Sequence, residues 1–161
     1  MFNLKDEFTY IISKVHNYLN FKDAICARQL MLGTCATETN LGRKLRQCGH
    51  SMQSDDGAFG FWQMELSTDV DIWTHLIMKK TRYLLYLKMS KLVGEMTHKD
   101  ALIGNLYYAC SMARLQYARH KEPLPPADDL MAQGVYYKKY FNGSGKGSAE
   151  KYVEDYKRFV L

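Results

Sequence analysis

The sequence predicts an all-α protein, or a mainly α protein with at most a short hairpin, in one domain that spans residues 1–161. Apolar residues recur at intervals of three and four along seven segments, which is typical of amphipathic helices. Residues that can cap a helix, such as Asn3 and Ser148, precede several of these segments. No segment has a convincing strand pattern, although residues 50–62 leave room for a short hairpin.

The first two helices are expected at about 4–19 and 23–38, with Asn3 and Asp23 as their N-caps. In the second helix, Glu38 ends a face that is otherwise apolar or small, because it follows at helical spacing after Ala27, Met31 and Thr34. The helix dipole and burial both disfavour a charged carboxylate at this position, so both raise the pKa of Glu38. An acid that stays protonated near neutral pH can act as a general acid. The alternative is a solvent-facing glutamate at a frayed helix end.

Five more helices are expected, at about 68–79, 81–93, 99–120, 127–140 and 148–160. The helix at 99–120 is the longest and is apolar over a wide arc, so we expect it to be central. Arg114 lies on one of its apolar stripes and needs a partner if it is buried, for which a carboxylate is the natural choice.

Residues 39–60 read as a loop, because turn-forming residues dominate them. A loop of this length inside a compact domain is usually functional. Asp55 and Asp56 follow Glu38 by 17 and 18 positions, and either is a candidate for a second carboxylate across a cleft. The alternative is a simple Asp-Asp-Gly turn.

Glycines and aromatic residues alternate in the segment Gly57-Ala58-Phe59-Gly60-Phe61-Trp62-Gln63-Met64. Gly57 and Gly60 allow backbone to approach a ligand closely, and Gln63 offers hydrogen-bond donors and acceptors. The rings of Phe59 and its aromatic neighbours offer flat faces to a ligand. The alternative is a turn whose aromatic side chains are simply buried.

Composition excludes several classes of function. No stretch approaches the roughly 20 apolar residues of a membrane span, and acids near the N-terminus leave no visible secretory signal. We therefore expect synthesis in a cytoplasm. The net charge is a mild +5, and Lys and Arg are spread along the chain apart from small clusters such as Lys138-Lys139, which argues against specific nucleic-acid binding. The four cysteines lack zinc spacing and are expected to be free thiols, and no metal or cofactor is implied.

Three segments in this order resemble a known family: 57–65 running on to 71–73, 112–119, and 136–142 with 145–148. A helix that ends in an acid, a loop and then Gly-Ala-Phe-Gly-Phe-Trp-Gln-Met resembles the soluble lytic transglycosylases and goose-type lysozymes of the lysozyme-like superfamily. The similarity is closest to phage-encoded transglycosylase-like proteins. The resemblance implies a lysozyme-like domain of about seven helices with a substrate cleft.

The resemblance also implies that Glu38 is the catalytic acid and that the sugar cleft is formed by Thr39, Phe59, Gly60, Gln63, Met64, Tyr117, Tyr140 and Asn142. Thr39 stands where the bacterial enzymes usually have serine, and it keeps the hydroxyl. Gly-Phe-Trp-Gln replaces their Gly-Leu-Met-Gln, which makes this part of the cleft bulkier.

The expected function is cleavage of the β-1,4 bond between N-acetylmuramic acid and N-acetylglucosamine in peptidoglycan, by lytic transglycosylase chemistry with one glutamate. One alternative is a hydrolytic muramidase that uses Asp55 or Asp56. Another is an inactive phage virion or tail protein that binds peptidoglycan. The expected partners are glycan strands and other virion proteins. The expected place of action is the periplasm or cell wall, reached as a virion component or after release by another factor.

Overall fold

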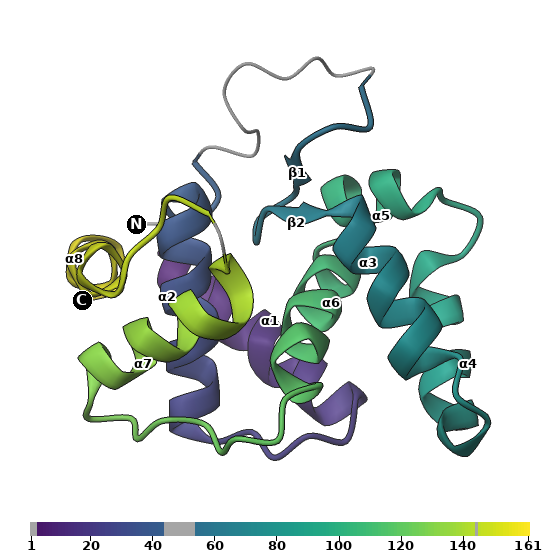
Figure 1. Ribbon diagram of the computed structural model, residues 1–161, viewed down its shortest axis with the longest axis horizontal. Coiled ribbons are helices and arrows are strands. Elements are labelled where there is room, and N and C mark those ends of the chain that lie inside the picture. The colour runs from purple at the N-terminus through teal and green to yellow at the C-terminus, as the bar shows by residue number, and fades with distance from the viewer. Residues whose placement is uncertain (1–2, 44–53, 144) are drawn as a thin grey trace.

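The computed structural model describes residues 3–43, 54–143 and 145–161. In this part of the chain the protein is mainly helical with one two-stranded antiparallel hairpin, which confirms the predicted fold class (Figure 1). The helices are α1 (Leu4–Tyr18), α2 (Ile25–Thr39), α3 (Leu66–Ile72), α4 (Tyr83–Val93), α5 (His98–Gly104), α6 (Leu106–Ala118), α7 (Leu130–Tyr137) and α8 (Ala149–Phe159). The strands are β1 (Ala58–Phe59) and β2 (Met64–Glu65). Wide π-helical turns at Trp73–Ile77 and Lys138–Asn142 extend α3 and α7, and a 3₁₀ turn at Lys80–Arg82 precedes α4.

Side-chain caps begin some of the predicted helices but not all. Asn3 and Ser148 accept hydrogen bonds from backbone N–H groups of the helices they precede, as predicted. The prediction that Asp23 caps α2 is wrong, because no side chain caps that helix. Asp23 instead bonds to Nδ1 of His16 at 2.9 Å and to the guanidinium of Arg28 at 2.8 Å. Its carboxylate therefore joins α1 to α2.

The long helix predicted at 99–120 is in fact two helices, α5 and α6. The break lies at Asn105, whose backbone is extended, with φ −108° and ψ 98°. Its side-chain oxygen accepts a hydrogen bond from the backbone N–H of Tyr108 at 3.0 Å, and its amide nitrogen donates to the carbonyl of Leu92 at 2.8 Å. Because these bonds satisfy the groups that a break exposes, a new helix begins here. The apolar residues keep their helical spacing on both sides of Asn105, so the sequence pattern gives no sign of the break.

The helices form two groups around a shared centre (Figure 1). α2, α7 and α8 pack against one another on one side, and α3, α4 and α5 lie on the other. α1 and α6 lie between the groups and contact each other. Close approach of α8 depends on two glycines: a Cβ on Gly33 would stand 2.1 Å from the hydroxyl of Tyr152, and one on Gly134 would stand 2.6 Å from the carbonyl oxygen of Ala149.

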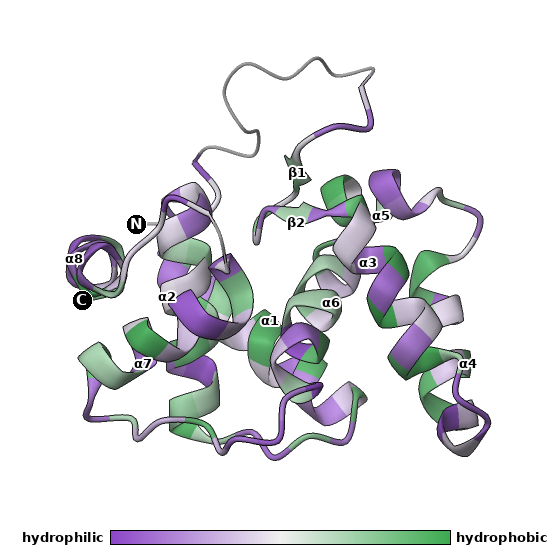
Figure 2. Ribbon diagram, in the orientation of Figure 1, coloured by the Kyte–Doolittle hydropathy of each residue, from purple (hydrophilic) through white to green (hydrophobic). Residues whose placement is uncertain are grey.

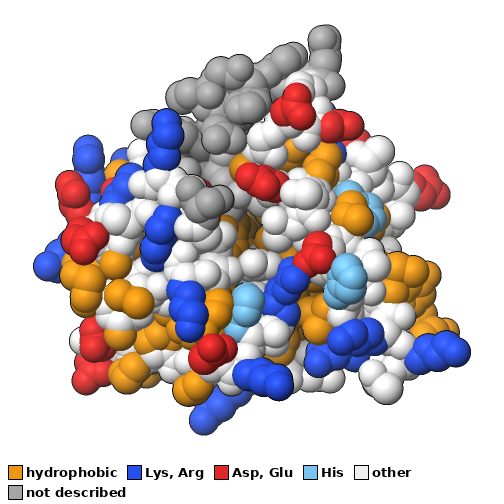
Figure 3. All heavy atoms as spheres, viewed as in Figure 1, with side chains coloured by type: hydrophobic (Ala, Val, Ile, Leu, Met, Phe, Trp, Pro, Cys, Tyr) orange, Lys and Arg blue, Asp and Glu red, His pale blue; other side chains and the backbone are white. Residues whose placement is uncertain are grey.

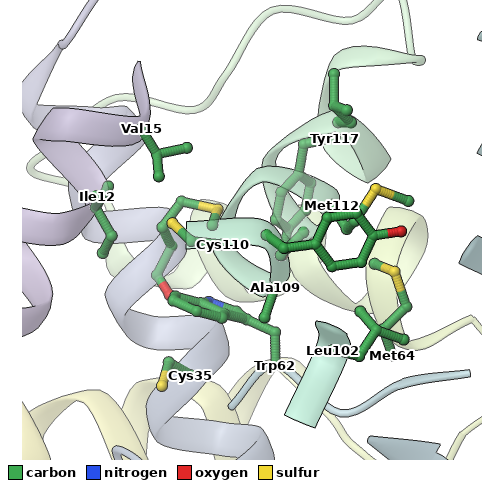
Figure 4. Packing of buried hydrophobic residues seen from close by; sticks show 14 of the residues in the cluster. Ile12, Val15, Cys35, Trp62, Met64, Leu102, Ala109, Cys110, Met112 and Tyr117 are labelled. Carbon is green, nitrogen blue, oxygen red and sulfur yellow. The ribbon is translucent and has the colours of Figure 1, made fainter. Parts of the chain in front are cut away.

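Most helices carry hydrophobic and hydrophilic residues together, as expected for amphipathic helices that share a core (Figure 2). Trp62 lies in this core between Cys35 of α2 and Ala109 of α6 (Figure 4). Its ring is 1% exposed and its indole N–H donates to the carbonyl of Met31 at 3.0 Å. Trp62 therefore anchors the turn of the hairpin to α2.

Two further expectations concern buried side chains. Cys26, Cys35 and Cys110 are free thiols, as predicted, and Cys48 lies outside the described residues. Arg114 is buried, but no carboxylate of the described residues forms an ion pair with it, so the expected partner is wrong. Its guanidinium lies over the ring of Phe21 at 4.4 Å from the centroid, and an aromatic face partly compensates a buried cation.

No helix in the described part of the chain is both long enough and apolar enough to cross a membrane.

Candidate active-site cleft

A cleft of about 820 Å³ opens between the two groups of helices. One wall is formed by the hairpin and the start of α3, and the other by residues within 137–143 and 145–151. Glu38 at the end of α2 lies in the lining between these walls. The other lining residues are Thr37, Ala58, Gln63, Met64, Glu65, Thr68, Gln116, Tyr137, Phe141, Asn142, Gly143, Gly145, Lys146, Gly147 and Lys151.

Glu38 occupies the position that the sequence predicts, in the last turn of α2. The helix stops directly after it, because Asn40 and Leu41 adopt left-handed conformations with φ 53° and 54°. The backbone N–H of Asn40 still bonds to a carbonyl of the helix, so the end is closed rather than frayed. The side chain of Glu38 is half-buried and lines the cleft.

Two polar side chains of the lining, Tyr137 and Asn142, face the Glu38 carboxylate. The hydroxyl of Tyr137 donates to Oε1 of Glu38 at 2.6 Å. The side-chain amide of Asn142 lies on the same side and favours the ionised carboxylate, so it lowers the pKa of Glu38. Lys138 donates to Oδ1 of Asn142 at 2.9 Å, which leaves the NH₂ group of that amide free to face Glu38. The end of α7 and the wide turn that follows it thus bring a tyrosine and an asparagine close to the same acid.

The pKa of Glu38 is raised above its ordinary value. Burial is the main cause, because removal from water penalises the charged form. The hydrogen bonds from Tyr137 and Asn142, and the positive charge of Lys151, lower the pKa of Glu38 and offset part of this effect. Glu38 can therefore hold a proton, and the residues around it also stabilise the carboxylate that remains when the proton leaves.

A glycine-rich turn covers the partners of Glu38. A Cβ on Gly145 would stand 2.7 Å from Nδ2 of Asn142, and one on Gly147 would stand 2.8 Å from the hydroxyl of Tyr137. Real Cβ atoms do not approach other atoms this closely, so any larger residue would displace Asn142 or Tyr137. Glycine is therefore required at both positions, because the turn packs closely against Asn142 and Tyr137.

The hairpin supplies the facing wall, as the sequence predicts for Gln63 and Met64. Gln63 has φ 45°, which is unusual for a residue with a side chain. Its side-chain amide donates to the carbonyl of Gly60 at 2.8 Å, which fixes the turn. The exposed carboxylate of Glu65 follows on the same wall.

Thr39 does not line the cleft, although the sequence predicted it as a substrate-binding residue. Its side chain is fully buried. The hydroxyl bonds to the carbonyl of Phe61 at 2.8 Å and to that of Cys35 at 3.0 Å, and it accepts from the N–H of Gly42 at 2.9 Å. Thr39 therefore joins the end of α2 to the hairpin and acts as a positioning residue.

Phe59 and Gly60 lie behind the cleft wall and not in it. The Phe59 side chain is 9% exposed, and Lys99 lies over its ring at 5.3 Å. Gly60 has φ 73°, and a Cβ there would stand 2.0 Å from the carbonyl oxygen of Leu102. Gly60 is thus required by contact with α5, not by contact with a ligand. Phe59 thus matches the second interpretation of this turn, in which the aromatic side chains are buried, and not the one in which they face a ligand.

Tyr117 and Tyr140 are also absent from the cleft lining. Tyr117 is 1% exposed, and its hydroxyl lies 2.6 Å from that of Thr34. Tyr140 packs against the rings of His120 and Tyr136. Both tyrosines contact the ring of Tyr136 in α7. By contrast, Asn142 from the same predicted set does reach the cleft.

Asp55 and Asp56 lie outside the cleft lining. The Asp55 side chain is 79% exposed and pairs with Lys99 at 3.0 Å. Asp56 accepts a hydrogen bond from the hydroxyl of Ser54 at 3.0 Å. This local arrangement matches the alternative of an Asp-containing turn.

The sequence did not single out Tyr137, Lys151 or Glu65, all of which line the cleft, whereas Phe141 lies within the region 140–142 that was expected to close it. One signal was available: Tyr137 and Phe141 are four positions apart, and their rings lie nearly parallel with centroids 6.2 Å apart. Lys151 and Glu65 carried no such signal, because each is a charged residue among many.

No family model matches the chain, and neither a curated protein nor a solved structure matches it. In the described ranges no group of three or more His, Cys, Asp or Glu side chains is placed to hold a metal ion.

Proposed function

We propose that this protein cleaves peptidoglycan glycan strands at the β-1,4 bond between N-acetylmuramic acid and N-acetylglucosamine, by lytic transglycosylase chemistry with Glu38 as the catalytic residue. One observation carries the proposal: a half-buried carboxyl group with a raised pKa lies in an 820 Å³ cleft and accepts a hydrogen bond from Tyr137. The resemblance of three segments to phage transglycosylase-like proteins supports the same reaction.

The reaction uses Glu38 first as an acid and then as a base. Protonated Glu38 gives its proton to the glycosidic oxygen as the bond from that oxygen to C1 of the muramoyl sugar breaks. The carboxylate then takes the proton of the muramoyl C6 hydroxyl, whose oxygen bonds to C1 and closes the 1,6-anhydro ring. Between these steps Tyr137, Asn142 and Lys151 stabilise the ionised carboxylate.

The cleft has the mixed lining that a sugar chain needs. Gln63, Gln116 and Asn142 bring amide side chains into the lining, and Phe141 and Met64 bring apolar ones. A cleft that is open at the surface can take a polymer along its length. Action on peptidoglycan would take place in the cell wall.

Hydrolysis is the second candidate reaction, and Glu65 is the observation that favours it. A hydrolytic mechanism with two carboxyl groups needs the second one on the far side of the sugar. Asp55 and Asp56 were the sequence candidates, but the cleft lining includes Glu65 in their place. If the enzyme is a muramidase, we expect Glu65 to be the residue that activates water.

The test is digestion of purified peptidoglycan sacculi with wild-type protein and with the Glu38→Gln and Glu65→Gln variants, followed by mass spectrometry of the released muropeptides. Products that end in 1,6-anhydromuramic acid, lost with Glu38→Gln and kept with Glu65→Gln, support the proposal. Hydrated reducing ends that need both residues indicate a muramidase. Sacculi that are bound but never cleaved would overturn both and indicate a binding or virion protein.

A further inference from the structure

An exposed hydrophobic surface covers α4 and the turn that precedes it. Four large side chains form this surface: Met78, Tyr83, Leu84 and Leu87, which are 62%, 62%, 70% and 43% exposed. None of them lines the cleft around Glu38. We call these four residues the α4 surface.

The α4 surface is not needed for packing of its own helix. Met89 and Val93 on the opposite side of α4 are buried and already join it to the core. Leu84 and Leu87 are three positions apart and share the outer face. A helix that is apolar on both faces is usually covered on both, so the outer face lacks a partner in the described chain.

A second cleft extends the apolar area next to this surface. It measures about 460 Å³, and it is lined by Val70, Trp73, Thr74, Met78, Tyr86, Ser90, Val93, Gly94 and His98. Met78 belongs both to this lining and to the α4 surface. The apolar region is therefore continuous from α3 to α4.

The same segment is strongly basic. Residues 72–94 contain five basic side chains and no acidic one, whereas the whole chain has 22 basic and 17 acidic residues, so the remainder has 17 of each. The five are Lys79, Lys80, Arg82, Lys88 and Lys91. Helix stability does not account for them, since the N-terminal end of α4, where Lys80 and Arg82 lie, favours negative charge.

Four of these cations are available to a partner. Lys79, Lys80, Arg82 and Lys91 are exposed and make no ion pair with any described residue. Lys88 instead bonds to the backbone of Tyr18 and lies over its ring. In the space-filling view, hydrophobic and basic side chains lie together at the lower right, where Figure 1 places α4 (Figure 3).

We propose that the α4 surface binds the face of a bilayer that contains anionic phospholipids. The apolar side chains would enter the boundary between head groups and acyl chains, and the surrounding cations would meet the lipid phosphates. A soluble polyanion would use the cations but not the exposed leucines. A second copy of the chain would bring four unpaired cations against four more, which charge repulsion opposes.

The proposal is independent of glycan cleavage, and the test is vesicle sedimentation with the full chain. The probes are large unilamellar vesicles of phosphatidylcholine alone, and of phosphatidylcholine with 30% phosphatidylglycerol. We expect binding to the anionic vesicles only. The Leu84→Gln/Leu87→Gln variant should bind at least tenfold more weakly. The Lys79→Gln/Lys80→Gln variant should lose about fivefold for each cation removed.

Matched control variants distinguish binding through the α4 surface from nonspecific binding to vesicles. Ile25, which is 61% exposed on α2, is the apolar control as Ile25→Gln, and Lys121→Gln/Lys157→Gln removes two other exposed cations. Both control variants should bind like the wild type. Far-ultraviolet circular dichroism checks folding, and unchanged cleavage of lipid-free sacculi, if the wild type cleaves them, shows that the Glu38 cleft is intact.

Three outcomes would overturn the proposal. The first is no binding of the wild type to anionic vesicles at millimolar lipid. The second is equal loss in the α4 and the control charge variants, which indicates unspecific attraction. The third is a dimer in analytical ultracentrifugation that Leu84→Gln/Leu87→Gln dissociates, which assigns the surface to a second copy.

Discussion

The hydroxyl of Tyr137 donates a hydrogen bond of 2.6 Å to Oε1 of Glu38, although the two residues are 99 positions apart in the chain. Glu38 lies at the end of α2, and Tyr137 is the last residue of α7. The protonation of the candidate acid therefore depends on how these two helices meet.

Replacement of Tyr137 by phenylalanine should raise the pKa of Glu38, because the lost hydrogen bond stabilises the carboxylate. If Glu38 acts first as an acid, activity falls as pH rises through its pKa. The alkaline limb of the pH–rate profile should then move to higher pH, and kcat should fall by about 10- to 100-fold. The measurement is the rate of sacculus digestion across pH.

Tyr136→Phe is the matched control for this variant. Its hydroxyl donates to the backbone carbonyl of Glu122 at 3.0 Å and does not contact Glu38. Its pH profile should equal that of the wild type. An alkaline limb that stays in place in Tyr137→Phe would contradict the assigned role of the tyrosine.

Glu38→Gln should stabilise the folded protein at neutral pH. The pKa of Glu38 is raised by folding, so the folded state binds its proton more tightly than the unfolded state does. Stability from this group is complete below the unfolded pKa, about 4.3, and is lost as pH rises through the folded pKa. Glutamine is neutral at every pH and avoids this loss. We expect a gain of about 0.5–2 kcal/mol at pH 7.

Urea unfolding at pH 7 and at pH 4 measures this difference. At pH 4 most of the gain should disappear, because the glutamate is then largely protonated in both states. Glu154→Gln, at an exposed position on α8, serves as the control and should change stability little at either pH. A loss of stability in Glu38→Gln at pH 7 would contradict the prediction.

Gly147→Ala should reduce activity with little loss of stability. The added Cβ would stand 2.8 Å from the hydroxyl of Tyr137, so the tyrosine or the turn must move away from Glu38. A small displacement of a catalytic contact can lower the rate by 10-fold or more. Gly104→Ala is the control, because a Cβ there meets nothing within 4 Å. Equal cleavage rates in Gly147→Ala and Gly104→Ala would contradict the close contact between this turn and Tyr137.

Thr39→Val should destabilise the protein by about 1–3 kcal/mol, because it leaves the carbonyl of Phe61 and the N–H of Gly42 without their buried partner. Thr39→Ser keeps the hydroxyl and should cost less. Urea unfolding measures both. Since the side chain lies outside the cleft, the KM of folded protein for sacculi should stay the same. An increase in KM with unchanged stability would restore a substrate contact to Thr39.

The role of a polar residue can be predicted from the sequence when its hydrogen-bond partners are only a few positions away. Asn3 and Ser148 cap their helices because a cap bonds to N–H groups only two or three positions away. Asn105 has the same chemistry, but the apolar pattern around it continues without interruption and hides the break. Asp23 could have capped α2, yet its contacts with His16 and Arg28 hold it elsewhere.

The sequence by itself determined the helical class, the helix that ends in Glu38 and the turn that carries Gln63 and Met64. These follow from periodicity, capping and turn chemistry, which act over a few residues. Only the tertiary structure decided that Tyr137 binds Glu38, that Thr39 is buried and that Asp55 lies outside the cleft. Such choices depend on the packing of helices that are far apart in the chain, and no local pattern records which faces will meet.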